Sequence, residues 1–119
     1  MNEQNLPTVA WKILGADDWK RLVAEGRYEG SPVDLADGYI HLSAADQLET
    51  TASKHYAGQT DLVLVEVDLT AVTDDVIWEP SRGGALFPHI YGALPLSATR
   101  KATPFSVTAD GRMVFAGNN

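Results

Sequence analysis

The chain has 119 residues, and 45% of them are apolar, which is enough to form the core of one packed domain. Sixteen Asp and Glu against nine Lys and Arg give a net charge of −7, which repels polyphosphate backbones and argues against a long nucleic acid as partner. Cysteine is absent, so disulfide bonds, thiolate metal sites and cysteine nucleophiles are excluded.

The chain shows no signal for secretion or membrane insertion. Residues 1–7 are polar and lack the cationic and apolar regions of a signal peptide. No apolar run approaches the roughly 20 residues that span a bilayer. The sequence therefore predicts a cytoplasmic protein without a membrane partner. It also predicts a single domain over residues 1–119, in which residues 1–7 and 116–119 are loose ends.

The N-terminal part of the chain predicts a strand followed by a helix. Side chains alternate over residues 9–14, as is typical of a strand. Trp19 and Leu22 recur at helical spacing within residues 16–25, and the glycine that follows is a C-terminal signal for a helix. Residues 28–37 contain glycine and proline and are predicted to form a loop.

The middle of the chain predicts a short strand, a helix and two further strands. Residues 38–42 form the short strand, which leads into a helix over 44–56. Residues 62–67 are almost continuously apolar and β-branched, which indicates a strand buried on both faces in the middle of a sheet. A brief strand over 76–79 ends at Pro80, because proline cannot donate to the ladder.

The C-terminal part begins with a long irregular segment. Residues 80–95 contain several glycines and prolines, so they are predicted to form a long loop rather than a regular element. Its aromatic and apolar side chains indicate that the loop packs against the domain. Residues 97–103 and 112–115 are predicted to supply closing strands.

The first candidate site residues lie on the short strand. Tyr39, His41 and Ser43 share one face, because successive residues of a strand point to opposite sides. An imidazole beside a hydroxyl can contact the edge of a ribose or a phosphate and can exchange a proton near neutral pH. His41 is therefore a candidate catalytic residue and Ser43 a candidate cofactor-binding residue. The alternatives are a structural hydrogen bond for His41, core packing for Tyr39, and an N-cap role for Ser43 with Asp46 three residues on.

A second set of candidates lies on the predicted helix. Thr51 and His55 are one turn apart and share a face, so Thr51 is a candidate cofactor-binding residue at the floor of the same pocket. The alternative is that the pair flanks the core. The three histidines, His41, His55 and His89, match no metal-binding spacing, and no metal is expected.

The remaining candidates surround the long predicted loop. Glu79 stands at a strand end beside a glycine-rich turn, which makes it a candidate catalytic acid group, and Arg82 is a candidate cofactor-binding residue. The two could equally form a structural salt bridge. His89 is a second candidate catalytic residue. Tyr91 is a candidate cofactor-binding residue that could stack on a flat ring or donate its hydroxyl, or it could simply pack beneath the loop.

The order and spacing of these motifs resemble a bacterial family, the domain of unknown function 952. The resemblance runs from about Val9 to Leu96. It rests on Trp19 with Gly26 and Tyr28, Asp-Gly-Tyr-Ile-His-Leu-Ser at 37–43, Gln47 with Thr50 and Thr51, residues 61–67, Trp78-Glu79, and Gly-Gly-Ala-Leu-Phe-Pro-His-Ile-Tyr-Gly at 83–92.

That family is similar in fold to the ADP-ribosyltransferase superfamily. The resemblance implies an α+β fold in which two small, mostly antiparallel sheets with two helices surround a cleft that holds NAD. It places His41 where the superfamily has the residue that contacts the nicotinamide ribose. It places Glu79 or His89 where the superfamily has a catalytic residue on a later strand.

Three functions follow from these residues. The leading hypothesis is a cleft lined by His41, Ser43, Arg82, His89 and Tyr91 that binds NAD or a related ADP-ribosyl or phosphorylated nucleotide and transfers or hydrolyses it. The second is a two-histidine phosphoesterase, since residues 41–43 match a His-x-Ser half-site, whereas 89–91 carry a phenol in place of the second hydroxyl. The third is a non-catalytic binding module. The first two require His41 and His89 to be neighbours at an open cavity.

Overall fold

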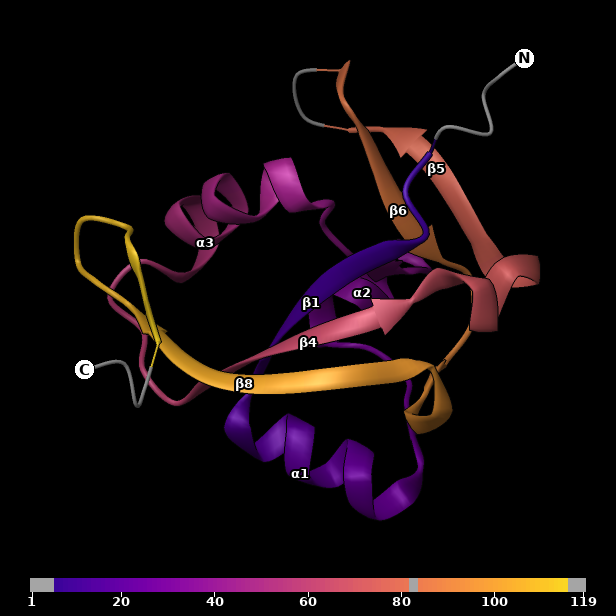
Figure 1. Cartoon of the computed structure of the whole chain (residues 1–119), viewed down its shortest axis with the longest axis horizontal. Coiled ribbons are helices and arrows are strands. Elements are labelled where there is room, and N and C mark those ends of the chain that lie inside the picture. Colours follow the sequence, from indigo (N-terminus) through magenta and orange to yellow (C-terminus); the bar gives the residue numbers. More distant parts are fainter. Residues whose placement is uncertain (1–5, 82–83, 116–119) are drawn as a thin grey trace.

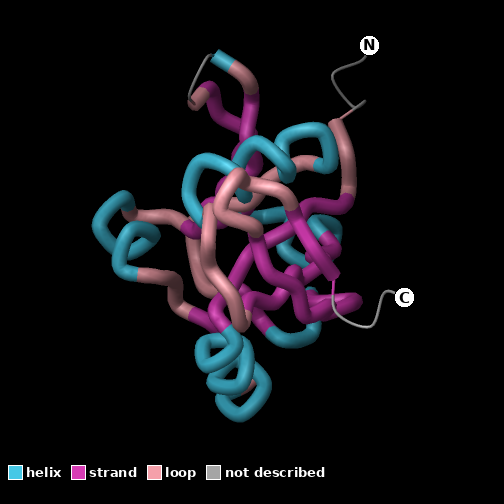
Figure 2. The backbone as a smooth tube through the Cα atoms, turned by 90° about the vertical axis from the view of Figure 1, so that its left-hand side faces the viewer, coloured by secondary structure: helices cyan, strands magenta, loops and turns pink. Residues whose placement is uncertain are grey.

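The computed structural model describes residues 6–81 and 84–115 and contains, in that part, three antiparallel sheets and three α-helices (Figures 1 and 2). The α-helices are α1 Ala16–Glu25, α2 Pro32–Asp37 and α3 Leu48–Tyr56. The strands are β1 Val9–Gly15, β2 Arg27–Tyr28, β3 Ile40–His41, β4 Leu62–Asp68, β5 Val76–Pro80, β6 Leu86–Ile90, β7 Leu94–Pro95, β8 Thr99–Val107 and β9 Met113–Phe115. Short 3-10 helices span Ala45–Gln47, Leu69–Asp75 and Leu96–Ala98.

The largest sheet has the strand order β1-β4-β8-β9, and each pair is antiparallel. Its β4 lies between β1 and β8, which confirms the central strand that the unbroken apolar run predicts. Side chains of β4 alternate between two cores, because successive residues of a strand point to opposite faces. Val63, Val65 and Val67 belong to one core, and Leu62 to the other.

A helix covers each face of this sheet. Leu22 and Trp19 of α1 pack into the core of Val63, Val65 and Val67, whereas Ala52 of α3 packs into the other core. Accordingly, α1 and α3 lie on opposite sides of the strands in Figure 1. Helix α1 has the predicted bounds and ends at Gly26, whose positive φ of 81° lets its N–H donate to the Leu22 carbonyl.

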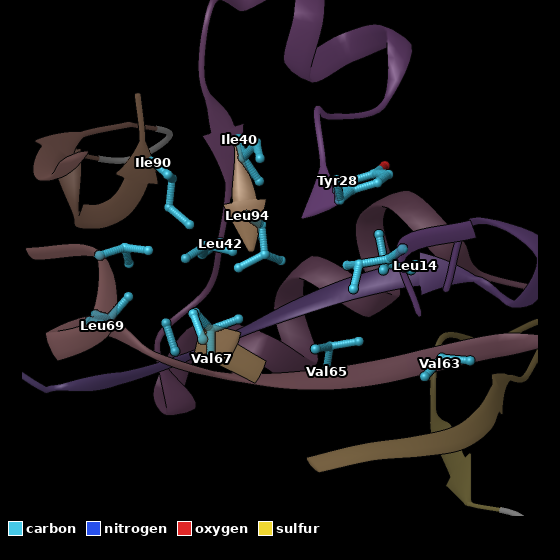
Figure 3. Packing of buried hydrophobic residues seen from close by; sticks show 14 residues of the cluster. Leu14, Tyr28, Ile40, Leu42, Val63, Val65, Val67, Leu69, Ile90 and Leu94 are labelled. Carbon is cyan, nitrogen blue, oxygen red and sulfur yellow. The ribbon is translucent and has the colours of Figure 1, made fainter. Parts of the chain in front are cut away.

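Two smaller sheets complete the fold, with strand orders β3-β6-β5 and β2-β7. Ile40, Ile90 and Leu94 from these sheets pack onto the row of valines along β4 (Figure 3). The sequence predicts two sheets, whereas the described residues form three, because Arg27 and Tyr28 pair with Pro95 and Leu94 apart from the other strands. The mixed fold of several antiparallel sheets with few helices agrees with the predicted class.

The prediction of a loop over residues 28–37 is wrong in its second half, which forms α2. Ser31 is the N-cap of this helix: its hydroxyl accepts from the Asp34 N–H at 3.2 Å, and the Asp34 carboxylate accepts from the Ser31 N–H at 2.9 Å. Pro32 occupies the first turn, where its missing N–H costs no helical hydrogen bond. This reciprocal pair of hydrogen bonds is a capping box, and its sequence signal is Ser31-Pro32-Val33-Asp34.

The prediction of an irregular loop over residues 80–95 is also wrong, because residues 86–90 form β6 in the centre of the β3-β6-β5 sheet. Proline is disfavoured in a central strand, yet Pro88 pairs with Trp78 of β5. On its other side the Pro88 carbonyl accepts a hydrogen bond from the Leu42 N–H at 3.1 Å. The reciprocal bond, from residue 88 to the Leu42 carbonyl, is missing because proline has no N–H. This missing hydrogen bond lies at the end of the β3–β6 pairing, because the next residue, Ser43, pairs with Trp11 of β1 instead.

Candidate functional site

The two central histidines lie directly opposite each other on neighbouring antiparallel strands. In the β3–β6 pair Ile40 faces Ile90 and His41 faces His89. The two isoleucines point into the core (Figure 3), so the two imidazoles share the opposite face of the sheet. Their ring centroids are 5.4 Å apart. The structure thus places as neighbours the two histidines on which the leading hypothesis depends.

Both histidines line a cavity of about 500 Å³, which is within the range of small-molecule sites. The cavity lies among β1, α2, β3, α3 and β6, so five segments that are distant in the sequence contribute to its wall. Its described lining residues are Trp11, Lys12, Ile13, Ser31, Val33, Asp34, Asp37, His41, Leu42, Ser43, Thr51, His55, Tyr56, Ser81, Phe87 and His89.

A buried carboxylate, Asp34, holds His41 from behind. Asp34 Oδ1 lies 2.6 Å from His41 Nδ1 and 3.2 Å from the His41 backbone nitrogen. The Lys12 ammonium lies 3.0 Å from Asp34 Oδ2, and both side chains are buried, with 8% and 2% exposed. Burial lowers the pKa of Lys12, against the opposing charge of Asp34. Burial also tends to raise the pKa of Asp34, but the Lys12 charge and the hydrogen bonds from His41 and Ser31 outweigh it and lower that pKa.

A second carboxylate approaches the other nitrogen of the same ring. His41 Nε2 lies 2.9 Å from Asp37 Oδ2, and the Asp37 side chain is 46% exposed. A neutral imidazole carries one N–H, so both contacts are hydrogen bonds only when the ring is protonated. His41 therefore sits between a buried carboxylate that is fixed by Lys12 and an exposed carboxylate at the cavity wall.

His89 has a carboxylate partner of its own, Glu79 of β5. His89 Nδ1 lies 2.6 Å from Glu79 Oε1, and the Tyr91 hydroxyl donates to the same carboxylate at 2.8 and 3.0 Å. Hydrogen bonds from His89 and then Tyr91 lower the pKa of Glu79, and the bond to Glu79 raises the pKa of Tyr91 to about 12. Tyr39 stacks on the His89 ring with centroids 4.1 Å apart. Among the described residues, Glu79, Tyr91 and Tyr39 contact His89 or its neighbours but do not line the cavity.

Two hydroxyls form a polar patch in the cavity wall. Ser43 Oγ and Thr51 Oγ1 lie 3.0 Å apart, which joins the end of β3 to α3. The alternative of Ser43 as an N-cap is wrong: a 3-10 helix, Ala45–Gln47, precedes α3, and the Gln47 side chain accepts from the Ala44 N–H at 2.9 Å. Ser43 is instead buried, and its hydroxyl is turned toward Thr51.

The structure therefore gathers His41, Ser43, Thr51 and His89 around one cavity, and it places Glu79 and Tyr91 behind His89. Arg82 lies outside the described residues. Sequence reasoning missed Lys12, Asp34 and Asp37. Lys12 shares a strand face with Ala10 and Leu14, and a lysine on a core-facing position needs a charged partner, so this signal was present.

Two further structural findings concern metals and membranes. Over residues 6–81 and 84–115, no group of three or more His, Cys, Asp or Glu side chains is arranged to hold a metal ion. In the same part of the chain, no helix has the length and apolar character needed to cross a bilayer.

Comparison with known proteins gives one family and one set of similar structures. Residues 13–102 match the model of a protein family of unknown function, DUF952. The crystal structure of protein CC0527 from Caulobacter crescentus is similar, with 46% identity and a TM-score of 0.84 over 89% of this chain and 93% of that one. A crystal structure of a CC0527 double mutant has 45% identity and a TM-score of 0.84 over the same shares. The solution structure of CC0527 has 46% identity and a TM-score of 0.78, over 89% of this chain and 91% of that one. No functionally curated protein matches the chain.

Proposed function

The chain belongs to the DUF952 family, and we propose that it binds NAD, or a related ADP-ribosyl or phosphorylated nucleotide, in the cavity between His41 and His89. The observation that carries this proposal is the pair of imidazoles 5.4 Å apart at the wall of one cavity, each with a carboxylate on Nδ1. Two such groups side by side can take and give a proton on the same ligand. We also propose that the chain is related in fold to the ADP-ribosyltransferase superfamily.

The other lining residues suit the parts of such a nucleotide. Trp11 and Phe87 offer flat rings on which a base or a nicotinamide can stack. The hydroxyls of Ser43 and Thr51 are short polar groups that match ribose hydroxyls. We therefore assign the binding of the nucleotide to the rings of Trp11 and Phe87, the hydroxyls of Ser43 and Thr51, and the two histidines.

The proposed reaction is transfer or hydrolysis at the ribose. Cleavage of the bond between ribose and nicotinamide develops positive charge on the ribose carbon, which a nearby carboxylate stabilises. Asp37 is a lining carboxylate that engages His41 through one oxygen, so its other oxygen can face a ligand. Glu79 acts through His89, because it contacts that ring and lies outside the cavity lining.

Isothermal titration with NAD and with ADP-ribose tests the proposal. Thr51→Val removes a cavity hydroxyl at constant shape and should weaken binding about fivefold, the effect of one hydrogen bond. Thr50→Val makes the same change at the neighbouring exposed position of α3 and should leave the affinity unchanged. Absence of heat with either ligand at millimolar concentration refutes the proposal and leaves a scaffold whose histidines only join strands.

A second function, cyclic phosphodiester hydrolysis, is favoured by one observation. Two-histidine phosphoesterases need two imidazoles facing one phosphate, and His41 and His89 are cross-strand neighbours. The second half-site is incomplete, since the Tyr91 hydroxyl is bonded to Glu79 and lies outside the cavity lining. Hydrolysis of a cyclic nucleotide that is lost in both His41→Ala and His89→Ala would establish this activity. No hydrolysis by the native chain excludes it.

A further inference from the structure

The ion pair of Lys12 and Asp34 joins three elements behind His41. Lys12 comes from the middle of β1, Asp34 from α2, and His41 from β3. A buried ion pair contributes little net stability compared with apolar residues of the same volume, because both charges lose their hydration. Its presence beside a cavity histidine therefore calls for a role other than stability.

Every oxygen of Asp34 is already occupied. Oδ1 faces Lys12 Nζ at 3.2 Å, the His41 N–H at 3.2 Å and His41 Nδ1 at 2.6 Å. Oδ2 faces Lys12 Nζ at 3.0 Å and the Ser31 N–H at 2.9 Å. Five contacts exceed the roughly four acceptor sites of a carboxylate, so Asp34 has no capacity for a ligand. What Asp34 can do is orient the ring that it contacts through both the backbone and the side chain.

The two carboxylates compete for the single proton of a neutral His41 ring. Asp34 is buried and lies 2.6 Å from Nδ1, whereas Asp37 is half-exposed and lies 2.9 Å from Nε2. A hydrogen bond to a charged group is stronger in a buried environment than in water, so Asp34 wins this competition. Lys12 is needed because an isolated buried carboxylate would take up a proton itself and stop acting as an acceptor.

We infer that Lys12 and Asp34 are positioning residues, which hold the neutral His41 ring with its proton on Nδ1 and present the Nε2 lone pair to a ligand in the cavity. The presence of a ligand there rests on the proposed function, whereas the state of the ring does not. Asp37 Oδ2 lies 2.9 Å from Nε2, which suits the protonated ring. On the neutral ring Nε2 carries no hydrogen for Asp37, so this half-exposed carboxylate has to turn away, and a ligand hydroxyl that takes its place donates to Nε2. A ribose hydroxyl is a group of the proposed nucleotides that can donate to this acceptor.

The test is the nitrogen NMR spectrum of the histidine rings in the ligand-free protein, at a pH high enough for the rings to be neutral. The His41 signals are assigned by their loss in His41→Gln. We expect the proton on Nδ1 in the native chain and in the control Asp37→Asn, which removes the competing carboxylate. In Lys12→Met combined with Asp34→Asn, which removes both buried charges at nearly constant volume, the proton should move to Nε2 and be donated to Asp37.

Two results would overturn the inference. A native spectrum with the proton on Nε2 does so without any variant, even if the double variant fails to fold. An unchanged Nδ1 proton in the folded double variant does so as well. Titration with NAD is a separate arm: a native chain with the expected ring state and no NAD binding contradicts the proposed function and leaves the positioning role in place.

Discussion

Replacing Lys12 by methionine should destabilise the protein strongly, because it leaves the Asp34 charge buried without its counterion. Breaking a buried pair costs about 3–5 kcal/mol. Asp34 keeps three N–H donors, from the Ser31 backbone and from the backbone and ring of His41, so we expect the lower end, about 3 kcal/mol. For a domain of this size that corresponds to a fall in Tm of roughly 10 °C or more.

The assay is urea unfolding followed by tryptophan fluorescence, with Lys101→Met as the matched control. Lys101 is exposed on β8, so the same substitution there should change stability by less than about 0.5 kcal/mol. Adding Asp34→Asn to Lys12→Met removes the uncompensated charge and should recover most of the loss. A cost of less than about 1 kcal/mol for Lys12→Met would show that Asp34 does not need its counterion, and a double variant no more stable than the single one would show the same.

Two further predictions concern pH. The pKa of Asp34 is lowered in the folded state, so the contribution of Asp34 to the free energy of unfolding is complete above about pH 5 and is lost as the pH falls below the unfolded pKa of about 4. The stability of the native chain should therefore fall more steeply with decreasing pH than that of the Lys12→Met, Asp34→Asn variant. Equal steepness would contradict this. The hydrogen bond to Glu79 raises the pKa of Tyr91 to about 12, so in Glu79→Gln this pKa should shift toward the ordinary value of about 10. The measurement is an ultraviolet titration, in which the Tyr91 signal is identified by its loss in Tyr91→Phe. An unshifted titration would show that the contact is absent in solution.

The shared face of His41 and Ser43 could be predicted from sequence because strand periodicity depends only on local geometry. Ile40 and Leu42 alternate with them and reach the core, as the pattern requires. Helix α1 and strand β4 could be predicted equally well, because the helical spacing of the first and the apolar run of the second are local patterns.

The partner strand of His41 could not be read in the same way. A proline in the middle of residues 86–90 argues locally against a central strand, and only the departure of the chain at Ser43 makes Pro88 tolerable there. The contact between Lys12 and Asp34 spans 22 residues and depends on how β1 and α2 meet. No periodicity reports such a contact, although the capping box at Ser31 and the core-facing lysine each indicated one half of it.

The central claim is that His41 and His89 face one nucleotide in a common cavity. Its most direct test is an NMR titration of the imidazole signals of both rings with NAD. We predict that the signals of His41 and His89 shift together along one binding curve, and that this curve moves to higher NAD concentration in Thr51→Val but not in Thr50→Val. Signals of both rings that stay unchanged at millimolar NAD would contradict the claim.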